Sequence, residues 1–146
     1  MTEAWVIYTD GSCRCNPGPG GWGAIMCHNG ETIELSGAES HTTNNRMELT
    51  ATVKALNALP QYSRVSVYTD SKYVKNGITT WIMNWKRNGW KTSNGKQVRN
   101  QDLWLALENS TQQHVVNWHW VKGHSGNSGN ERADELANRA IEKMFG

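Results

Sequence analysis

The sequence has 146 residues, 37% of them hydrophobic, which suits one globular domain and argues against a disordered, fibrous or two-domain chain. No apolar run is long enough to span a membrane, and the first residues lack the basic and hydrophobic segments of a secretory signal, so we expect a cytoplasmic protein without membrane contact. The net charge is only +2, but residues 71–101 carry seven basic side chains and no acid, which indicates a polyanionic partner.

The first half of the chain predicts a strand, a hairpin and a helix. Residues 4–10 are β-branched and aromatic and end at a glycine, which is typical of a strand. Asn29-Gly30 is a strong signal for a two-residue hairpin turn, and alternating polarity around Ile33 and Leu35 predicts a half-buried strand. Residues 45–59 follow a helical period, with four polar residues in one narrow arc and apolar residues around the rest.

The second half alternates strands and helices. Residues 64–70 predict a strand that ends in Tyr-Thr-Asp, as the first strand does. We expect helices over 71–78 and 80–88, with breaks at Gly77 and Gly89, and a turn at Asn94-Gly95. A helix over 102–110, a strand over 115–121, a glycine-rich loop and a helix over 131–144 complete the order. The prediction is a single α/β domain over 1–146 with a five-stranded mixed sheet flanked by helices.

Four acids stand out from this pattern. Asp10 and Asp70 close two matching strands, and the carboxyl ends of adjacent parallel strands lie side by side. Glu48 falls within the apolar arc of its helix, and Asp134 borders the apolar stripe of the last helix. Carboxylates that meet in one pocket must take up protons or bind cations, and a set of hard oxygen ligands favours Mg²⁺ or Mn²⁺. Two such ions can clamp a phosphodiester for hydrolysis by water.

Simpler roles remain open for each residue alone. A strand-end aspartate is often a turn residue, Asp134 could interact with the helix dipole, and Glu48 could form a capping box with Asn45. His124 lies in the glycine-rich loop, where it could transfer protons to the leaving group or simply be a surface histidine. Cys13, Cys15 and Cys27 are odd in number and suit free thiols in a reducing compartment.

Four blocks, YTDGSCRCNPGPGGWG, TTNNRMELTA, YTDSKYV and WVKGHSGNSGNERADELA, resemble the bacterial type 1 ribonuclease H family in order and spacing over essentially the whole chain. The resemblance implies endonucleolytic hydrolysis of the RNA strand of an RNA/DNA hybrid with two Mg²⁺ ions, leaving 5′-phosphate and 3′-hydroxyl ends; Mn²⁺ is a possible substitute. It also implies the family's fold, with a basic helical protrusion over about 80–99. The metal-binding positions of the family correspond to Asp10, Glu48, Asp70 and Asp134, its loop histidine to His124, and an auxiliary acid to Glu131.

The resemblance also implies substrate contacts. Cys13, Asn16, Asn44 and Asn45 match minor-groove positions, and Thr43 matches part of a pocket for a DNA phosphate. Helix capping by residues 43–45 and burial of Cys13 are the alternatives. The protrusion contributes the tryptophans and cations Trp81, Trp85, Lys86, Arg87, Trp90 and Lys91, although Trp81 and Trp85 could instead form a local core. Lys72 stands where relatives often have glutamine, so an ionic groove contact is expected there.

Two other classes of function compete with this one. A nuclease or integrase that acts on DNA could share the carboxylates, and a nucleic-acid-binding module could have lost catalysis, although all four acids are present. A phosphatase is more distant, because it leaves the basic lobe unexplained. We expect a monomer without an obligate protein partner.

Overall fold

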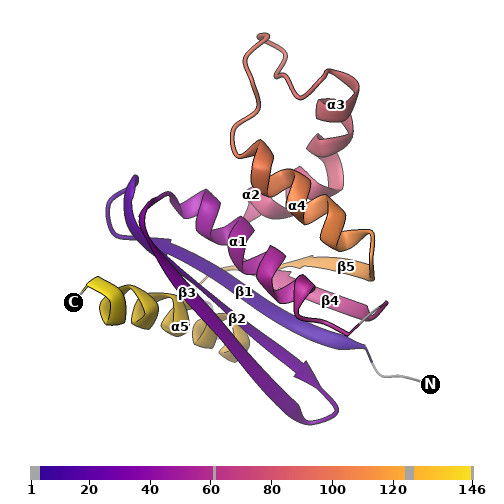
Figure 1. Cartoon of the computed structure of the whole chain (residues 1–146). Helices are drawn as coiled ribbons and strands as arrows, with labels where there is room; N and C mark the ends of the chain where they lie inside the picture. The colour runs from indigo at the N-terminus through magenta and orange to yellow at the C-terminus, as the bar shows by residue number, and fades with distance from the viewer. Residues whose placement is uncertain (1–3, 61, 124–126, 146) are drawn as a thin grey trace.

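The computed structural model describes residues 4–60, 62–123 and 127–145 and contains a five-stranded mixed sheet with helices on both faces (Figure 1). The strands are β1 (Trp5–Cys13), β2 (Gly18–His28), β3 (Glu31–Thr42), β4 (Arg64–Thr69) and β5 (Val115–Trp120). Their order is β3-β2-β1-β4-β5. The first three strands are antiparallel, whereas β1, β4 and β5 run parallel. The predicted α/β class and mixed sheet are therefore confirmed.

The β2–β3 hairpin turns at the predicted pair. Asn29 and Gly30 have φ angles of 52° and 80°, the left-handed region that a two-residue hairpin turn of this type requires. The first strand, by contrast, is longer than predicted. β1 continues past Asp10 because Gly11, Ser12 and Cys13 still pair with β2.

Helices cover the two faces of the sheet unequally. α1 (Asn44–Asn57) crosses one face, with α4 (Gln101–Thr111) packed beside it, and α5 (Ser128–Phe145) lies on the opposite face against β1, β2 and β3 (Figure 1). Because both the sheet and α4 pack on α1, even the polar residues Thr50 and Thr52 of this helix are buried. The exposed polar arc of α1 is therefore narrower than the arc predicted from the sequence, because Thr50 is buried.

The segment after β4 forms a lobe that projects away from the sheet (Figure 1). It contains α2 (Lys72–Asn76), a π-helical turn η1 (Gly77–Trp81) and α3 (Ile82–Arg87). The expected break at Gly77 is wrong, since Gly77 has helical φ and ψ angles of −62° and −50°. Glycine at this position instead allows the Trp104 ring to pack closely against the backbone, because a Cβ at Gly77 would lie 2.6 Å from Cζ2 of that ring.

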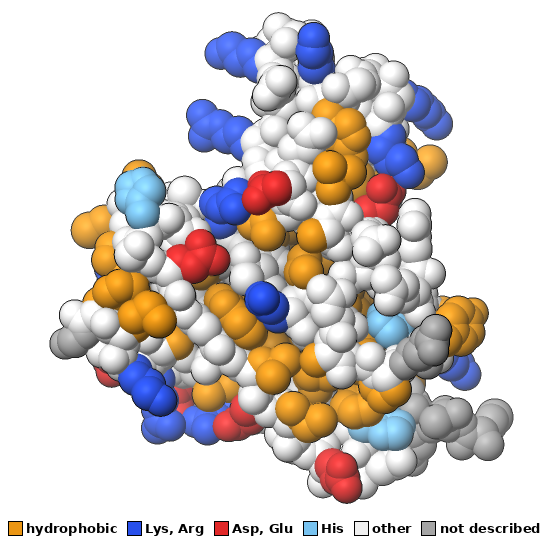
Figure 2. Space-filling model, in the orientation of Figure 1, with side chains coloured by type: hydrophobic (Ala, Val, Ile, Leu, Met, Phe, Trp, Pro, Cys, Tyr) orange, Lys and Arg blue, Asp and Glu red, His pale blue; other side chains and the backbone are white. Residues whose placement is uncertain are grey.

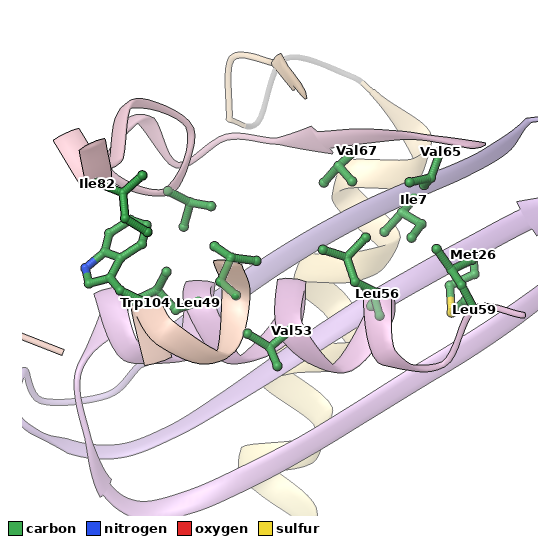
Figure 3. Packing of buried hydrophobic residues seen from close by; sticks show 14 of the residues in the cluster. Ile7, Met26, Leu49, Val53, Leu56, Leu59, Val65, Val67, Ile82 and Trp104 are labelled. Carbon is green, nitrogen blue, oxygen red and sulfur yellow. The ribbon is translucent and has the colours of Figure 1, made fainter. Parts of the chain in front are cut away.

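The main core lies between the sheet and α1. Figure 3 shows Ile7, Val65 and Val67 of the sheet beside Leu56 of this helix. The same cluster extends through Leu49 to Trp104 of α4 and Ile82 of the lobe, so the lobe and the sheet share one core. Among the described residues, no helix combines the length and apolar character needed to cross a membrane.

Candidate active site

Asp10 and Asp70 lie where the parallel pairing of β1 and β4 ends. The last paired residues are Thr9 and Thr69, and the two aspartates follow them directly. The sheet geometry therefore places both carboxylates at one edge, as the repeated Tyr-Thr-Asp predicts. Asp10 is 5% exposed and Asp70 is half-buried.

Glu48 reaches this edge from α1. Thr43 is the N-cap of the helix, and its side chain accepts a hydrogen bond from the backbone N–H of Arg46 at 3.2 Å. The alternative of a capping box between Asn45 and Glu48 is therefore wrong, because Glu48 is the fifth residue of the helix. Thr43 is the residue that caps this helix, as the alternative interpretation of residues 43–45 expected, and its predicted contact with a DNA phosphate stays a prediction.

Three carboxylates form a tight group. Asp10, Glu48 and Asp70 each offer an oxygen within 4.8 Å of the others. Asp134 of α5 lies outside that group but lines the same groove, of about 420 Å³, together with Ser12 and Cys13. The structure thus brings together all four acids that the sequence singled out, with Asp134 at the margin.

The acids affect each other's ionisation strongly. Burial raises the pKa of Asp10, and the negative charges of Glu48 and Asp70 raise it further. Burial also raises the pKa of Glu48, with contributions from Asp70 and Asp134. Both shifts have the same physical origin, namely carboxylates that are removed from water and face like charges.

The donor set fits divalent metal ions. One oxygen of Glu48, Oε2, is buried and has no hydrogen-bond partner among the described residues, which is costly for an acid unless a cation binds it. The neighbouring donors are hard carboxylate oxygens, which suit Mg²⁺ or Mn²⁺ better than zinc. Asp10, Glu48, Asp70 and Asp134 are the residues that could hold such ions.

A second groove leads from the lobe to the acids. Its volume is about 640 Å³, and its walls include Asn16, Thr43, Tyr73, Trp85 and Lys96. Asn44 and Asn45 line both this groove and the acidic one, so the two are continuous at the start of α1. A long polyanion could follow this path from the basic lobe to the carboxylates.

The predicted minor-groove residues lie at this junction. The side chain of Asn16 accepts a hydrogen bond from the backbone N–H of Asn44 at 3.0 Å, which ties the β1–β2 connection to α1. The Cys13 thiol is half-buried and within hydrogen-bonding distance of the carbonyls of Cys15, Gly18 and Thr42. Cys13 therefore lines the acidic groove while its thiol bonds to the protein's own backbone.

The tryptophans of the lobe pack against one another and also line surface grooves. Trp85 stacks at an angle between Trp81 and Trp90 and packs on Trp104, so it belongs to the local core. The same side chain lines the large groove, and with Trp81 and Lys91 it also lines a smaller one of about 420 Å³. Trp81 is 37% exposed.

The cations of the lobe are not equivalent. Figure 2 shows Lys and Arg side chains projecting from the lobe. Arg87 and Lys91 are exposed, whereas Lys86 forms an ion pair of 2.8 Å with Glu108 of α4. Lys72 is exposed as well, and its Nζ lies 4.8 Å from the centre of the Trp120 ring. This contact was not expected from the sequence, which predicted only a contact with substrate.

Two predicted residues have weaker structural support. His124 lies outside the described residues, so its expected role stays a prediction. Glu131 is exposed in the first turn of α5 and is not among the residues that line the acidic groove.

Sequence reasoning missed the residues that brace the large groove. Arg46 forms a two-point ion pair with Asp102, with distances of 3.0 and 2.9 Å, and donates to the side chain of Asn100. Asn100, in the left-handed conformation, donates in turn to the Tyr73 hydroxyl. The feature that singles out Asn100 is its positive φ angle just before α4, and a φ angle cannot be read from the sequence.

Comparison with known proteins decides the classification. The profile of the family described as RNase H matches residues 2–142. A curated ribonuclease H from Francisella philomiragia is 59% identical over 141 residues, which cover 97% of this chain and 93% of the relative. The chain belongs to the ribonuclease H family.

Other relatives agree with this assignment. Ribonuclease H of Francisella tularensis subsp. novicida is 57% identical over 97% of this chain and 93% of its own length. Among solved structures, LC9-RNase H1, described as a type 1 RNase H with the type 2 active-site motif, has a TM-score of 0.86 and 33% identity over 98% of this chain and 74% of that one. LC11-RNase H1 in complex with RNA/DNA hybrid has a TM-score of 0.72 and 26% identity over 97% and 99%. The ribonuclease H fold and the enzyme class expected from the sequence are therefore confirmed.

Proposed function

We propose that this ribonuclease H cleaves the RNA strand of RNA/DNA hybrids internally, with two divalent metal ions, and leaves 5′-phosphate and 3′-hydroxyl ends. The observation that carries the proposal is the group of Asp10, Glu48 and Asp70, within 4.8 Å of one another, at the end of a groove that begins at the cationic lobe. The solved relative LC11-RNase H1 was crystallised with an RNA/DNA hybrid, which supports the same substrate here.

Each part of the site would contribute differently to the reaction. Asp10, Glu48, Asp70 and Asp134 would hold the metal ions, which when bound supply an activated water and stabilise the leaving oxygen. The carboxylates themselves repel a phosphate, so they would hold the scissile phosphate in the groove only through the cations that they bind. His124, by its sequence position, would transfer a proton to the leaving group.

Hybrid selectivity would come from the polar junction of the two grooves. Asn16, Asn44 and Asn45 are exposed and carry amides that can hydrogen-bond to ribose 2′-hydroxyls across a shallow minor groove. Such contacts do not depend on base sequence. The lobe would hold the DNA strand through its exposed cations, Arg87 and Lys91, and through the rings of Trp81 and Trp85.

A labelled hybrid tests the proposal. The parental protein with Mg²⁺ should shorten the RNA strand, leave the DNA strand intact and lose activity when EDTA removes the metal. Asp10→Asn should lower kcat by at least about a thousandfold, because it removes a metal ligand at the centre of the site. Glu31→Gln, which changes an exposed acid at the hairpin, is the matched control and should cleave at the parental rate. Parental cleavage by Asp10→Asn would overturn the site assignment.

The same assay separates the competing functions. Duplex DNA and duplex RNA are run beside the hybrid with both strands followed. Preferential cleavage of duplex DNA would favour a DNA nuclease, and metal-independent binding without turnover would favour a binding module. Our proposal requires that the hybrid be the best substrate and that only its RNA strand be cut.

We also propose that the chain acts as a single-domain monomer in the cytoplasm without an obligate protein partner. The proposed compartment is supported by Cys13, Cys15 and Cys27, which are all free thiols, as suits a reducing environment. Light scattering of the purified protein should give a mass near 16.4 kDa. A dimer mass would contradict the proposed monomer.

A further inference from the structure

Asn138 lies one helical turn after Asp134 on α5, and both ends of its side-chain amide are hydrogen-bonded. Its oxygen accepts from the Ser12 hydroxyl and from Arg14 Nη1, each at 3.3 Å. Its nitrogen donates to Asp134 Oδ1 at 3.3 Å and to the Asp134 backbone carbonyl at 3.0 Å. Because two donors face the amide oxygen, the NH₂ group must point toward Asp134. Asn138 therefore links the end of β1 to the fourth acid of the site.

Asp134 is the acid whose position depends most on such help. Asp10, Glu48 and Asp70 form the tight group, and Asp134 stands outside it at the margin of the same groove. A carboxylate at the half-buried margin of a group of like charges is pushed outward. The amide of Asn138, which donates a hydrogen bond to Asp134 Oδ1, opposes this outward movement of the Asp134 side chain and is itself uncharged.

We propose that Asn138 is a positioning residue for Asp134, and that Ser12 holds Asn138 in the orientation this requires. The inference rests on the proposed function, because it assumes that Asp134 helps to bind a metal ion. Hydrogen-bond partners behind metal ligands typically change metal affinity by about 10–100-fold when they are removed. Since the other three acids do not contact Asn138 in any described hydrogen bond, the effect should fall on one ion rather than on both.

A purely structural role is the competing explanation. An Asp–Asn pair four residues apart stabilises a helix only slightly, and in this explanation the bond to Ser12 merely joins α5 to β1. Such a role would lower the melting temperature and leave metal binding unchanged. The two explanations therefore differ in a quantity that can be measured without hybrid or turnover.

Calorimetric titration of the free protein with Mn²⁺ is the direct test. Asn138→Leu removes both hydrogen-bonding ends, and we expect it to weaken one class of Mn²⁺ site by about 10–100-fold while the other keeps its parental affinity. Ser12→Ala leaves Asn138 in place and should weaken the same site by less. Arg139→Ala, the adjacent exposed residue of α5, is the matched control and should give the parental isotherm.

Kinetics give an independent readout. The Mg²⁺ concentration for half-maximal cleavage should rise in Asn138→Leu, with kcat recovering at high Mg²⁺ and the KM for hybrid unchanged. Superimposable Mn²⁺ isotherms of Asn138→Leu and the parental protein, with cleavage intact, would overturn the positioning role alone. A parental protein that neither binds Mn²⁺ nor cleaves hybrid would overturn the proposed function, and this role with it. If Asn138→Leu fails to fold, the Ser12→Ala isotherm decides in the same way.

Discussion

Gly11 of β1 lies directly against the backbone of Glu48. A Cβ at Gly11 would overlap the backbone nitrogen of Glu48 and lie 2.6 Å from the carbonyl carbon of Met47. Helix α1 can approach β1 closely enough to place Glu48 beside Asp10 only because residue 11 has no side chain. The metal-binding geometry therefore depends on a residue that has no ligand atom of its own.

Gly11→Ala should accordingly damage activity more than stability. The obstruction is backbone, which cannot rotate away, so α1 must shift and carry Glu48 with it. We expect a loss of roughly 1–3 kcal/mol in the free energy of unfolding, typical of overpacking, and a much larger relative loss of kcat. Denaturant unfolding and hybrid cleavage measure the two effects. Parental activity in a folded Gly11→Ala protein would contradict this account of the site.

The metal-free protein should become less stable as pH rises. Burial and like charge raise the pKa values of Asp10 and Glu48 above the ordinary carboxyl range, near pH 4. Above about pH 4 the unfolded state has released these protons, whereas the folded state still holds them. The free energy of unfolding therefore falls as pH rises from about 4 toward the raised pKa values of Asp10 and Glu48. Urea unfolding in EDTA at several pH values checks the sign.

Asp10→Asn should remove much of that dependence. The amide keeps the shape of the side chain but carries no charge, so we expect the metal-free variant to gain about 1–3 kcal/mol at neutral pH relative to the parental protein. Mg²⁺ should stabilise the parental protein more than the variant. Equal pH dependence of the two proteins in EDTA would show that the acids do not repel each other as described.

Neutralising the lobe should weaken hybrid binding mainly through its salt dependence. Replacing Lys86, Arg87 and Lys91 together with alanine should reduce the slope of log affinity against log salt by about 2 rather than 3, because Glu108 already compensates Lys86. Fluorescence anisotropy at several salt concentrations, with an Asp10→Asn background to prevent cleavage, measures the slope. Lys143→Ala on α5 is the control, and an unchanged slope in the triple variant would refute the role of the lobe.

His114 should matter for stability and not for chemistry. Its ring is buried, accepts a hydrogen bond from the Ser63 backbone N–H at 3.0 Å and lies 3.1 Å from the Leu56 carbonyl. It thereby joins the last turn of α1 to the start of β4, the opposite ends of these two elements from Glu48 and Asp70. His114→Ala should lower the free energy of unfolding by about 2–4 kcal/mol, since it leaves buried polar groups unpaired.

Cleavage by His114→Ala, assayed well below its melting temperature, should keep the parental kcat. His41→Ala changes an exposed histidine and should leave stability unchanged. A His114→Ala protein of parental stability would mean that the two backbone groups find other partners.

The sequence alone determined which residues can take part in chemistry and roughly where the elements lie. The repeated Tyr-Thr-Asp placed Asp10 and Asp70 together because parallel strands bring their ends to one edge, and Glu48 was found because an acid on an apolar helix arc needs a partner. The Asn29-Gly30 turn was predicted for an equally local reason, since few residue pairs adopt two left-handed conformations. Periodicity and turn chemistry act over a few residues and so are readable in one dimension.

Tertiary structure decided everything that depends on distant neighbours. Gly77 does not break the helix because its role is to admit Trp104, and β1 extends beyond Asp10 because β2 continues to pair with it. The separation of Asp134 from the tight group, and the amide of Asn138 behind it, follow from where α5 crosses the end of β1. The Ser12–Asn138 contact joins segments more than a hundred residues apart. The geometry of all these contacts is fixed by packing, which no local pattern encodes.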